Sequence, residues 1–293
     1  MGPGPARAKN RSRTLGPLSG TRSSSSGARP YLRAMRLGLL AGENVLSFSP
    51  LIFRRAYGLS YEVYSPTHID RLKEELTAKG WIGFNVTTPY KEAIFPLLDE
   101  KEPIVEVLGA VNTVAIYPDG RWRGYNTDYR AARYLLGEWE AVYGGWEALL
   151  ILGTGGAARA VAQAWKDLFP EAPLWLVSRN PHRPLPYPTL PYTALTERPW
   201  PERLLLVQAT PLGAFPAPLQ TPPFHLSLIQ PSWTVVDLIY NPNPTRFLTQ
   251  ARARGAAIES GFEFLRRQAE YSRTIWDPLW KEAYASRRKA GST

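Results

Sequence analysis

The chain has 293 residues, of which 44% are hydrophobic and none is cysteine, a composition that indicates a globular protein and excludes disulfides and thiolate zinc sites. Its three histidines lie far apart in the sequence, so we expect no metal site. The formal net charge is +10, but residues 1–34 hold seven Lys and Arg and no acids, so the remainder carries only +3.

Residues 1–34 form a low-complexity segment of Gly, Pro, Ser and Arg ahead of Met35. Such a composition has almost nothing to bury, so we predict a disordered basic leader or an extension from a mis-assigned start. Its Arg- and Ser-rich character is also typical of an organellar transit peptide, although amphipathic spacing is lacking. Nucleic-acid binding through this leader stays an alternative; for the rest of the chain we expect no nucleic-acid partner.

The expected location follows from two further features. No apolar run approaches the roughly 20 residues that a membrane-spanning helix needs, so we expect no membrane partner. The lack of cysteine fits a cytoplasmic protein, which is the location we predict. Both a monomer and a homodimer are compatible with the sequence.

From Met35 onward, strand-like apolar runs alternate with helical ones. In the first half we predict strands over 35–42, 61–65 and 81–87, helices over 50–58, 68–80, 91–99 and 128–144, and a hairpin over 111–126 turning at Asp119-Gly120. In the second half we predict strands at 148–152, 173–180, 204–211 and 234–242, and a final helix from Gly261 onward. This alternation is typical of an α/β protein with mostly parallel sheets.

The stretch "ILGTGGAARA" places Gly153, Gly155 and Ala158 in a G-x-G-x-x-A pattern between a predicted strand and a predicted helix. The first glycine makes the tight turn, and the second lets the backbone approach a pyrophosphate. The helix N-terminus then supplies N–H donors and the positive end of a dipole. The pattern predicts a dinucleotide site; a purely structural glycine turn is the alternative.

The end of the next predicted strand distinguishes between cofactors. An NAD site places Asp or Glu about 20 residues after the glycines, where it binds the ribose hydroxyls. Here Ser178 stands at that spacing, followed by Arg179 and Arg183, which can bind a 2′-phosphate. We therefore predict NADP, with two exposed loop arginines as the alternative interpretation.

Polar side chains gather where the predicted strands of the first half end, a place where ligands bind in open α/β sheets. These clusters are Ser47 and Ser49, Asn85 and Thr87, Asn112, and Asn126 with Asp128. Each also has a structural interpretation: a serine of the first pair could cap the helix at Pro50, Asp128 could cap the helix from Tyr129, and Asn112 could serve a turn. Four clusters in one half of the chain favour a binding site.

The motifs "SFSP", "GFNVTTPYK", "GAVNTV", "GYNTD", "GTGGAA", "ATPLG", "DLIYNPNPTRFL" and "GFEFLRRQ" occur in the order and spacing of shikimate dehydrogenases, which the chain resembles from about Met35 to its end. The resemblance implies reversible reduction of 3-dehydroshikimate to shikimate by NADPH. It also implies a substrate domain over 35–135, an NADP domain over 136–254 and C-terminal helices over 255–293 that pack back on the first domain. Gly144-Gly145 is a plausible boundary between the two halves.

The resemblance also assigns roles by position. It implies Lys91 and Asp128 as the catalytic pair. It implies that Ser47, Ser49 and Tyr240 hold the substrate carboxylate and that Thr87, Asn112 and Gln268 bind ring hydroxyls. For the cofactor it implies Gly153, Gly155, Gly156, Ala157, Arg179 and Arg183, with Gly261 near the nicotinamide.

Several residues depart from the family pattern and keep alternatives open. Leu46 stands where the family usually has histidine, Phe264 where it has methionine, and "SRN" where it has "NRT". These changes touch the carboxylate-binding loop and the cofactor pocket. A quinate or dual-specificity enzyme, or one that uses NAD, is therefore one alternative, and a catalytically silent NADP-binding relative is another.

Overall fold

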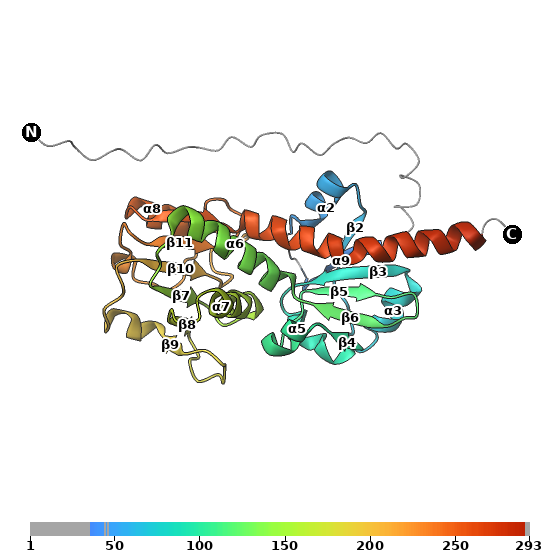
Figure 1. Ribbon diagram of the computed structural model, residues 1–293, viewed down its shortest axis with the longest axis horizontal. Helices are drawn as coiled ribbons and strands as arrows, with labels where there is room; N and C mark the ends of the chain where they lie inside the picture. The colour runs from blue at the N-terminus through green and yellow to red at the C-terminus, as the bar shows by residue number, and fades with distance from the viewer. Residues whose placement is uncertain (1–35, 44, 46, 291–293) are drawn as a thin grey trace, which may run out of the picture.

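The computed structural model describes residues 36–43, 45 and 47–290, with side chains described as far as residue 281. Two six-stranded sheets lie at opposite ends of the long axis of the molecule (Figure 1). The leader at 1–34, the position of Leu46 and residues 291–293 lie outside the described residues. In the part of the chain that is described, no helix has an apolar stretch long enough to cross a membrane, and no three His, Asp or Glu side chains group as metal ligands would.

The first sheet has the strand order β2-β1-β3-β5-β6-β4. Its strands are β1 (Arg36–Leu40), β2 (Tyr61–Tyr64), β3 (Trp81–Val86), β4 (Glu100–Lys101), β5 (Thr113–Ile116) and β6 (Trp122–Tyr125). β1 pairs in parallel with β2 and β3, whereas β3, β5 and β6 pair antiparallel. The predicted hairpin is confirmed as β5 and β6, with Gly120 in the turn at a φ of +85°.

Helices cover both faces of the first sheet, because its strands alternate apolar side chains between the two faces. Leu39 of β1 packs in a cluster with Phe53 of α2 (Ser49–Tyr57). Leu40 packs on the opposite face with Leu72 of α3 (Leu72–Ala78). The sheet is therefore buried on both sides, and its polar groups gather at the strand ends.

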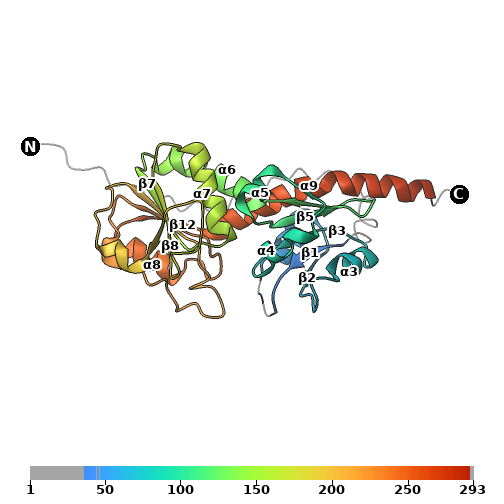
Figure 2. The same cartoon turned by 90° about the horizontal axis from the view of Figure 1, so that it is seen from below.

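The helix predicted over 91–99 is shorter than expected. α4 (Tyr90–Ala93) is followed by a separate 3-10 turn at Phe95–Leu97. Pro96 has no N–H and cannot continue an α-helix, which explains the break. α5 (Pro103–Leu108) completes this region and lies beside the second half of the molecule (Figure 2).

The second sheet is entirely parallel, with the order β12-β11-β10-β7-β8-β9. Its strands are β7 (Ala148–Leu152), β8 (Leu174–Ser178), β9 (Thr189–Pro191), β10 (Leu204–Gln208), β11 (Thr234–Asp237) and β12 (Ala257–Ser260). This is the order of a doubly wound, Rossmann-type sheet, in which ligands bind where the strand order reverses. Here that point lies between β7 and β10.

The helices of the second half pack on both faces of its sheet. Buried residues of α6 (Thr127–Tyr143) and α7 (Gly156–Leu168) share one core cluster with β7. Buried residues of α8 (Arg246–Ala253) belong to the cluster on the other face. All five residues of β7 are buried, as expected for the central strand of a parallel sheet.

The C-terminal segment differs in one respect from the helices expected over 255–293. Residues 257–260 form β12, the edge strand of the second sheet, which pairs with β11. Only Ala257 and Ile258 in this strand are apolar, so the sequence carries little strand signal there. α9 (Gly261–Ala290) then runs along both halves of the molecule (Figure 1), and Trp276 Nε1 donates to the Val114 carbonyl of β5 at 2.9 Å.

Candidate active site

Lys91 follows the buried strand β3 and lies in the short helix α4. Its Nζ donates to Asp128 Oδ2 at 2.5 Å. The Asp128 side chain is 4% exposed and the Lys91 side chain 17% exposed, so both charged groups are largely shielded from water. The structure thus brings the two residues of the predicted catalytic pair into contact.

Asp128 is free to make this contact because another residue caps its helix. Asn126 is the N-cap of α6, and its Oδ1 accepts from the Tyr129 backbone N–H at 2.9 Å. The interpretation of Asp128 as a helix cap is therefore wrong. Its carboxylate lies in the first turn and pairs across to Lys91, which belongs to a different element.

A small cavity of about 110 Å³ opens beside Lys91 and Asp128. Five of the predicted substrate-binding residues line it, namely Ser47, Ser49, Thr87, Tyr240 and Gln268. The two serines contact each other through their hydroxyls at 3.1 Å, and Ser47 Oγ also accepts from the Ser49 backbone N–H at 3.1 Å. The N-cap position of α2 is Phe48, so neither serine is the N-cap, although Ser47 Oγ accepts the first N–H of the helix.

Asn112, the sixth predicted substrate-binding residue, lines neither cavity described here. Its side chain is buried, donates to Thr127 Oγ1 at 3.0 Å and to Gln268 Oε1 at 3.2 Å, and accepts from the Thr127 backbone N–H at 2.6 Å. Because Asn112 holds the carbonyl oxygen of Gln268, the Gln268 amide is oriented within the cavity wall. A ring-hydroxyl contact from Asn112 stays a prediction.

Asn85, which the sequence places in a polar cluster but to which it gives no role, also lines the small cavity. Its Oδ1 accepts from the Tyr61 hydroxyl at 2.7 Å, and its Nδ2 donates to Thr113 Oγ1 and Ser272 Oγ, both at 2.8 Å. Burial raises the pKa of Tyr61 well above its usual value, so the phenol remains a donor. Tyr61 and Ser272 carry no motif that would have revealed this network in the sequence.

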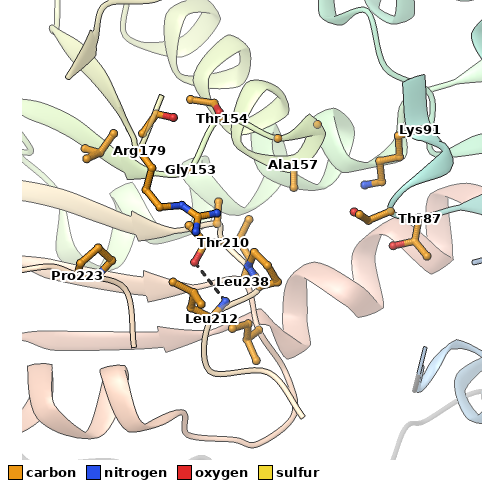
Figure 3. Close-up of a pocket in the computed structure, with 18 of the residues that line it drawn as sticks. Thr87, Lys91, Gly153, Thr154, Ala157, Arg179, Thr210, Leu212, Pro223 and Leu238 are labelled. Carbon is orange, nitrogen blue, oxygen red and sulfur yellow. Dashed lines mark hydrogen bonds between the residues drawn. The ribbon is translucent and has the colours of Figure 1, made fainter. Parts of the chain in front are cut away.

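A larger cavity of about 510 Å³ lies over the carboxyl ends of the second sheet. Gly153, Gly155, Gly156 and Ala157 from the β7–α7 turn line it, and so does Arg179 at the end of β8. Thr87 and Lys91 line this cavity as well as the small one. Figure 3 shows Lys91 and Thr87 at one side of the large cavity and Arg179, Gly153 and Thr210 at the other.

The glycine turn has the geometry that a pyrophosphate needs. Gly153 adopts a φ of +117°, which side chains rarely tolerate. Gly155 is the N-cap of α7, and a Cβ there would meet nothing within 4 Å, so the backbone is open to an approaching group. The N-terminus of α7 supplies unpaired N–H groups and the positive end of its dipole. These residues fit the dinucleotide that the sequence predicts.

The lining of the large cavity also fits a 2′-phosphate. Among the residues that the structure describes, none of those lining the cavity is Asp or Glu, and Ser178 and Arg179 lie at the end of β8. Ser178 Oγ accepts from the Asn180 backbone N–H at 3.0 Å, so it shapes the turn that follows. An NAD-binding carboxylate is therefore missing from this wall, while a guanidinium is present.

Two predicted cofactor residues, Arg183 and Gly261, do not line the cavity. Arg183 Nη2 instead contacts Glu92 of α4 at 3.0 and 3.2 Å. Gly261 donates its N–H to the Ile239 carbonyl, and a Cβ there would lie 2.0 Å from the Leu238 carbonyl oxygen. Gly261 thus packs against the backbone of residues 238–239, which form part of the cavity wall. Direct cofactor contacts of Arg183 and Gly261 stay predictions.

Sequence reasoning missed other residues that line the large cavity. Thr210 and Leu212 belong to "ATPLG", a motif whose order supported the family resemblance but whose residues received no role. Tyr192 follows β9 and carries no motif signal; burial raises its pKa to about 12, so it is a neutral phenol at physiological pH. These residues follow the ends of β9 and β10, where dinucleotide sites are expected.

Asp237 ends β11, immediately before the cavity-lining residues Leu238 and Ile239. Burial raises the pKa of this carboxyl to about 6, although hydrogen bonds from Thr245 Oγ1 and the Ile239 backbone N–H oppose the shift. The two hydrogen bonds measure 2.7 and 3.0 Å. A carboxyl in this state binds a proton in the folded protein at pH values where the unfolded chain is ionised.

We expect the free energy of unfolding to fall as pH rises through about 6, by up to about 3 kcal/mol from Asp237 alone. The stabilising contribution is complete below the unfolded pKa of 3.8 and is lost as pH passes the folded value. Chemical denaturation between pH 4 and 8 should therefore show that Asp237→Asn removes this slope. Asp70→Asn, the same change at an exposed carboxyl, is the control. Parallel curves for Asp237→Asn and the parent protein would contradict the expectation.

Together, the Rossmann-type sheet, its glycine turn and the two cavities that meet at Lys91 define a two-domain dinucleotide-binding protein with a small-molecule site beside the phosphate loop. Residues 40–114 match the family model described as the shikimate dehydrogenase substrate binding domain. The chain is 34% identical over 251 residues to a shikimate dehydrogenase (NADP(+)) from Desulforamulus reducens, with 78% of this chain and 85% of that one covered. This chain belongs to the shikimate dehydrogenase family.

Solved structures agree with this assignment. A shikimate 5-dehydrogenase from Thermus thermophilus, in complex with NADP(H) and shikimate, is 30% identical with a TM-score of 0.67, and 86% of this chain and 99% of that chain are covered. A quinate dehydrogenase from Corynebacterium glutamicum, in complex with NAD, is 25% identical with a TM-score of 0.70, and 84% and 93% are covered. The predicted family and the two-domain α/β fold are confirmed.

Proposed function

We propose that this protein catalyses the reversible reduction of 3-dehydroshikimate to shikimate with NADPH, a step in aromatic amino acid biosynthesis. The observation that carries the proposal is the Lys91–Asp128 pair: Lys91 lines both cavities, and Asp128 lines the small one. A hydride donor in the large cavity and a carbonyl compound in the small one would meet beside this pair. The relatives named shikimate dehydrogenase (NADP(+)) support the same reaction.

The chain would hold the cofactor through the glycine turn and Arg179. The backbone of Gly153, Gly155 and Gly156 with the N-terminus of α7 would bind the pyrophosphate, and Arg179 would bind the 2′-phosphate. When bound, the cofactor supplies a hydride to the substrate carbonyl carbon. Gly261 keeps the wall at Leu238 and Ile239 close to the α9 N-terminus, because any side chain there would collide with the Leu238 backbone.

Lys91 and Asp128 would transfer the proton that accompanies the hydride. As the carbonyl carbon gains the hydride, its oxygen becomes an alkoxide, and the Lys91 ammonium stabilises this charge and supplies the proton. Asp128 orients Lys91 through their 2.5 Å contact. In the reverse reaction the pair takes the hydroxyl proton as the hydride leaves.

The small cavity would orient the substrate. The adjacent hydroxyls of Ser47 and Ser49, with Tyr240, would hold the carboxylate, while Thr87 and Gln268 would bind ring hydroxyls. A site built to hydrogen-bond hydroxyls rejects analogues that lack them. Quinate carries a further tertiary hydroxyl, so the space around Ser47 and Thr87 determines whether it is accepted.

A dual-specificity or quinate-preferring enzyme is the second candidate, favoured by the fold similarity to a quinate dehydrogenase in complex with NAD. Steady-state kinetics of the full chain with NADP⁺ or NAD⁺, each with shikimate or quinate, test both. We expect shikimate with NADP⁺ to give the largest kcat/KM. A larger value for quinate or for NAD⁺ would favour the second candidate, and no turnover with measurable NADP⁺ binding would favour a silent relative.

We place the protein in the cytoplasm and expect a monomer or a homodimer with small-molecule ligands as its partners. Size-exclusion chromatography with light scattering measures the oligomeric state. If deletion of residues 1–34 leaves the kinetics unchanged, the basic leader has no part in catalysis.

A further inference from the structure

Glu92, the residue after Lys91, connects the two halves of the molecule through charge. Its Oε1 accepts from Arg159 Nη2 of α7 at 2.9 Å and from Arg183 Nη2 at 3.0 Å. α4 belongs to the first half, whereas both arginines belong to the second. Burial favours a higher pKa for Glu92, but its hydrogen bonds with Arg183 and Arg159 outweigh this and lower the pKa, so the carboxylate stays charged.

Arg159 is buried and therefore needs a negatively charged partner. Its residue is 5% exposed, and Glu92 is its one carboxylate partner among the described residues. A buried guanidinium without a counter-charge is strongly unfavourable, so Arg159 holds the Glu92 carboxylate near α7. Arg159 lies three residues after Gly156, one turn from the phosphate loop.

Lys91 touches the same helix at its first residue. A Cβ at Gly156 would lie 3.2 Å from Lys91 Cδ, so the lysine stem packs directly on the N-terminus of α7. α4 has only four residues and no side-chain cap, and so short a helix has no stability of its own. Its placement relative to α7 therefore depends on contacts such as Glu92 with Arg159.

We propose that Glu92 is a positioning residue. Through Arg159 it fixes Lys91 against the phosphate loop, and so it fixes the position of the small cavity relative to the large one. The inference rests on the proposed function for its kinetic effects and on the geometry alone for its structural ones. Glu92 lines neither cavity, so it acts through Lys91 and not by touching a ligand. Small misplacements of reacting groups reduce rates by up to about 100-fold, so the relative position of the two cavities affects the rate of hydride transfer.

The kinetic test is the single-turnover rate of hydride transfer in Glu92→Gln, which keeps the shape of the side chain and removes its charge. We expect the rate to fall about 10- to 100-fold. The deuterium isotope effect with substrate labelled at the carbinol carbon should rise, while the Kd of shikimate alone stays within about 2-fold of the parent value. Glu171→Gln, an exposed carboxylate without an ion pair among the described residues, is the control.

A double-mutant cycle tests the route through Arg159. Arg159→Met removes the buried charge, so the double variant Glu92→Gln/Arg159→Met leaves no unpaired guanidinium and guards against a simple loss of folding. We expect the double variant to be no slower than Glu92→Gln alone, because both changes break one contact. Effects that multiply in the double variant would overturn the proposal.

An activity-free measurement uses the absence of native cysteine. Spin labels at Glu74→Cys in α3 and Glu197→Cys beyond β9 report the distance between the halves by pulsed electron resonance. We expect Glu92→Gln to broaden this distribution and Glu171→Gln to leave it unchanged. An unchanged distribution together with an unchanged hydride-transfer rate would overturn the proposal. If the distribution broadens but the parent protein does not oxidise shikimate, the contact of Glu92 with Arg159 still positions the two halves, and the proposed reaction is wrong.

Discussion

Replacing Lys91 with methionine is expected to lower kcat for shikimate oxidation by about 1,000-fold, the combined effect of losing a proton-transfer group and an electrostatic stabiliser. Methionine keeps most of the apolar stem that packs on Gly156, so the fold and the large cavity should persist. The Asp128 carboxylate would lose its ammonium partner and remain buried. Because the charge acts most strongly on the transition state, the KM for shikimate should change far less than kcat.

Stopped-flow and steady-state absorbance of NADPH measure this effect. Lys166→Met, at an exposed position in the last turn of α7, is the matched control and should retain parent activity. The Kd of NADP⁺ should be close to the parent value in both variants. A Lys91→Met enzyme that keeps more than about a tenth of the parent kcat would contradict the assigned role.

Replacing Arg179 with leucine is expected to lower kcat/KM for NADP⁺ by about 100-fold and to leave kcat/KM for NAD⁺ nearly unchanged. In the described part of the chain, Arg179 and Lys91 are the charged side chains that line the large cavity. A bidentate contact from a guanidinium to a phosphate provides two charge-assisted hydrogen bonds, each worth about 1.5–3 kcal/mol. NAD⁺ lacks this phosphate, so the loss should fall on one cofactor alone.

The ratio of kcat/KM for the two cofactors measures the contribution of Arg179. Arg55→Leu, an exposed arginine in α2, serves as the control for the loss of a positive charge. An equal loss with both cofactors would indicate that Arg179 supports the cavity wall and does not recognise the phosphate. An unchanged ratio would move the recognition to Arg183, which would then have to leave Glu92.

Much of the fold could be predicted because its signals are local. The glycine turn at Gly153 and Gly155 stands between an apolar strand and a helix, and this context favours a Rossmann-type unit over a purely structural turn. The β5–β6 hairpin has an Asp-Gly turn between two short strand-like runs. β12 was missed because its four residues carry only two apolar side chains and depend on pairing with β11.

The candidate site was harder to predict because its contacts join distant segments. Whether Asn126 or Asp128 caps α6 cannot be decided from "NTD" alone, since both side chains suit a helix start. Arg183 illustrates the limit most clearly: its spacing after the glycines favours a phosphate contact, but Glu92 lies 91 positions earlier and provides a competing carboxylate. Asn112 has a similar explanation, because Thr127 and Gln268 reach it only in the folded chain.

The most direct test of the account is a crystal structure of Lys91→Met with NADP⁺ and shikimate bound, in which slow turnover preserves both ligands. We predict shikimate in the small cavity with its carboxylate at Ser47 and Ser49, and its carbinol carbon about 3–4 Å from the nicotinamide, beside Thr87 and residue 91. Shikimate bound elsewhere, or a nicotinamide that does not reach this shared wall, would contradict the claim that the two cavities form one active site.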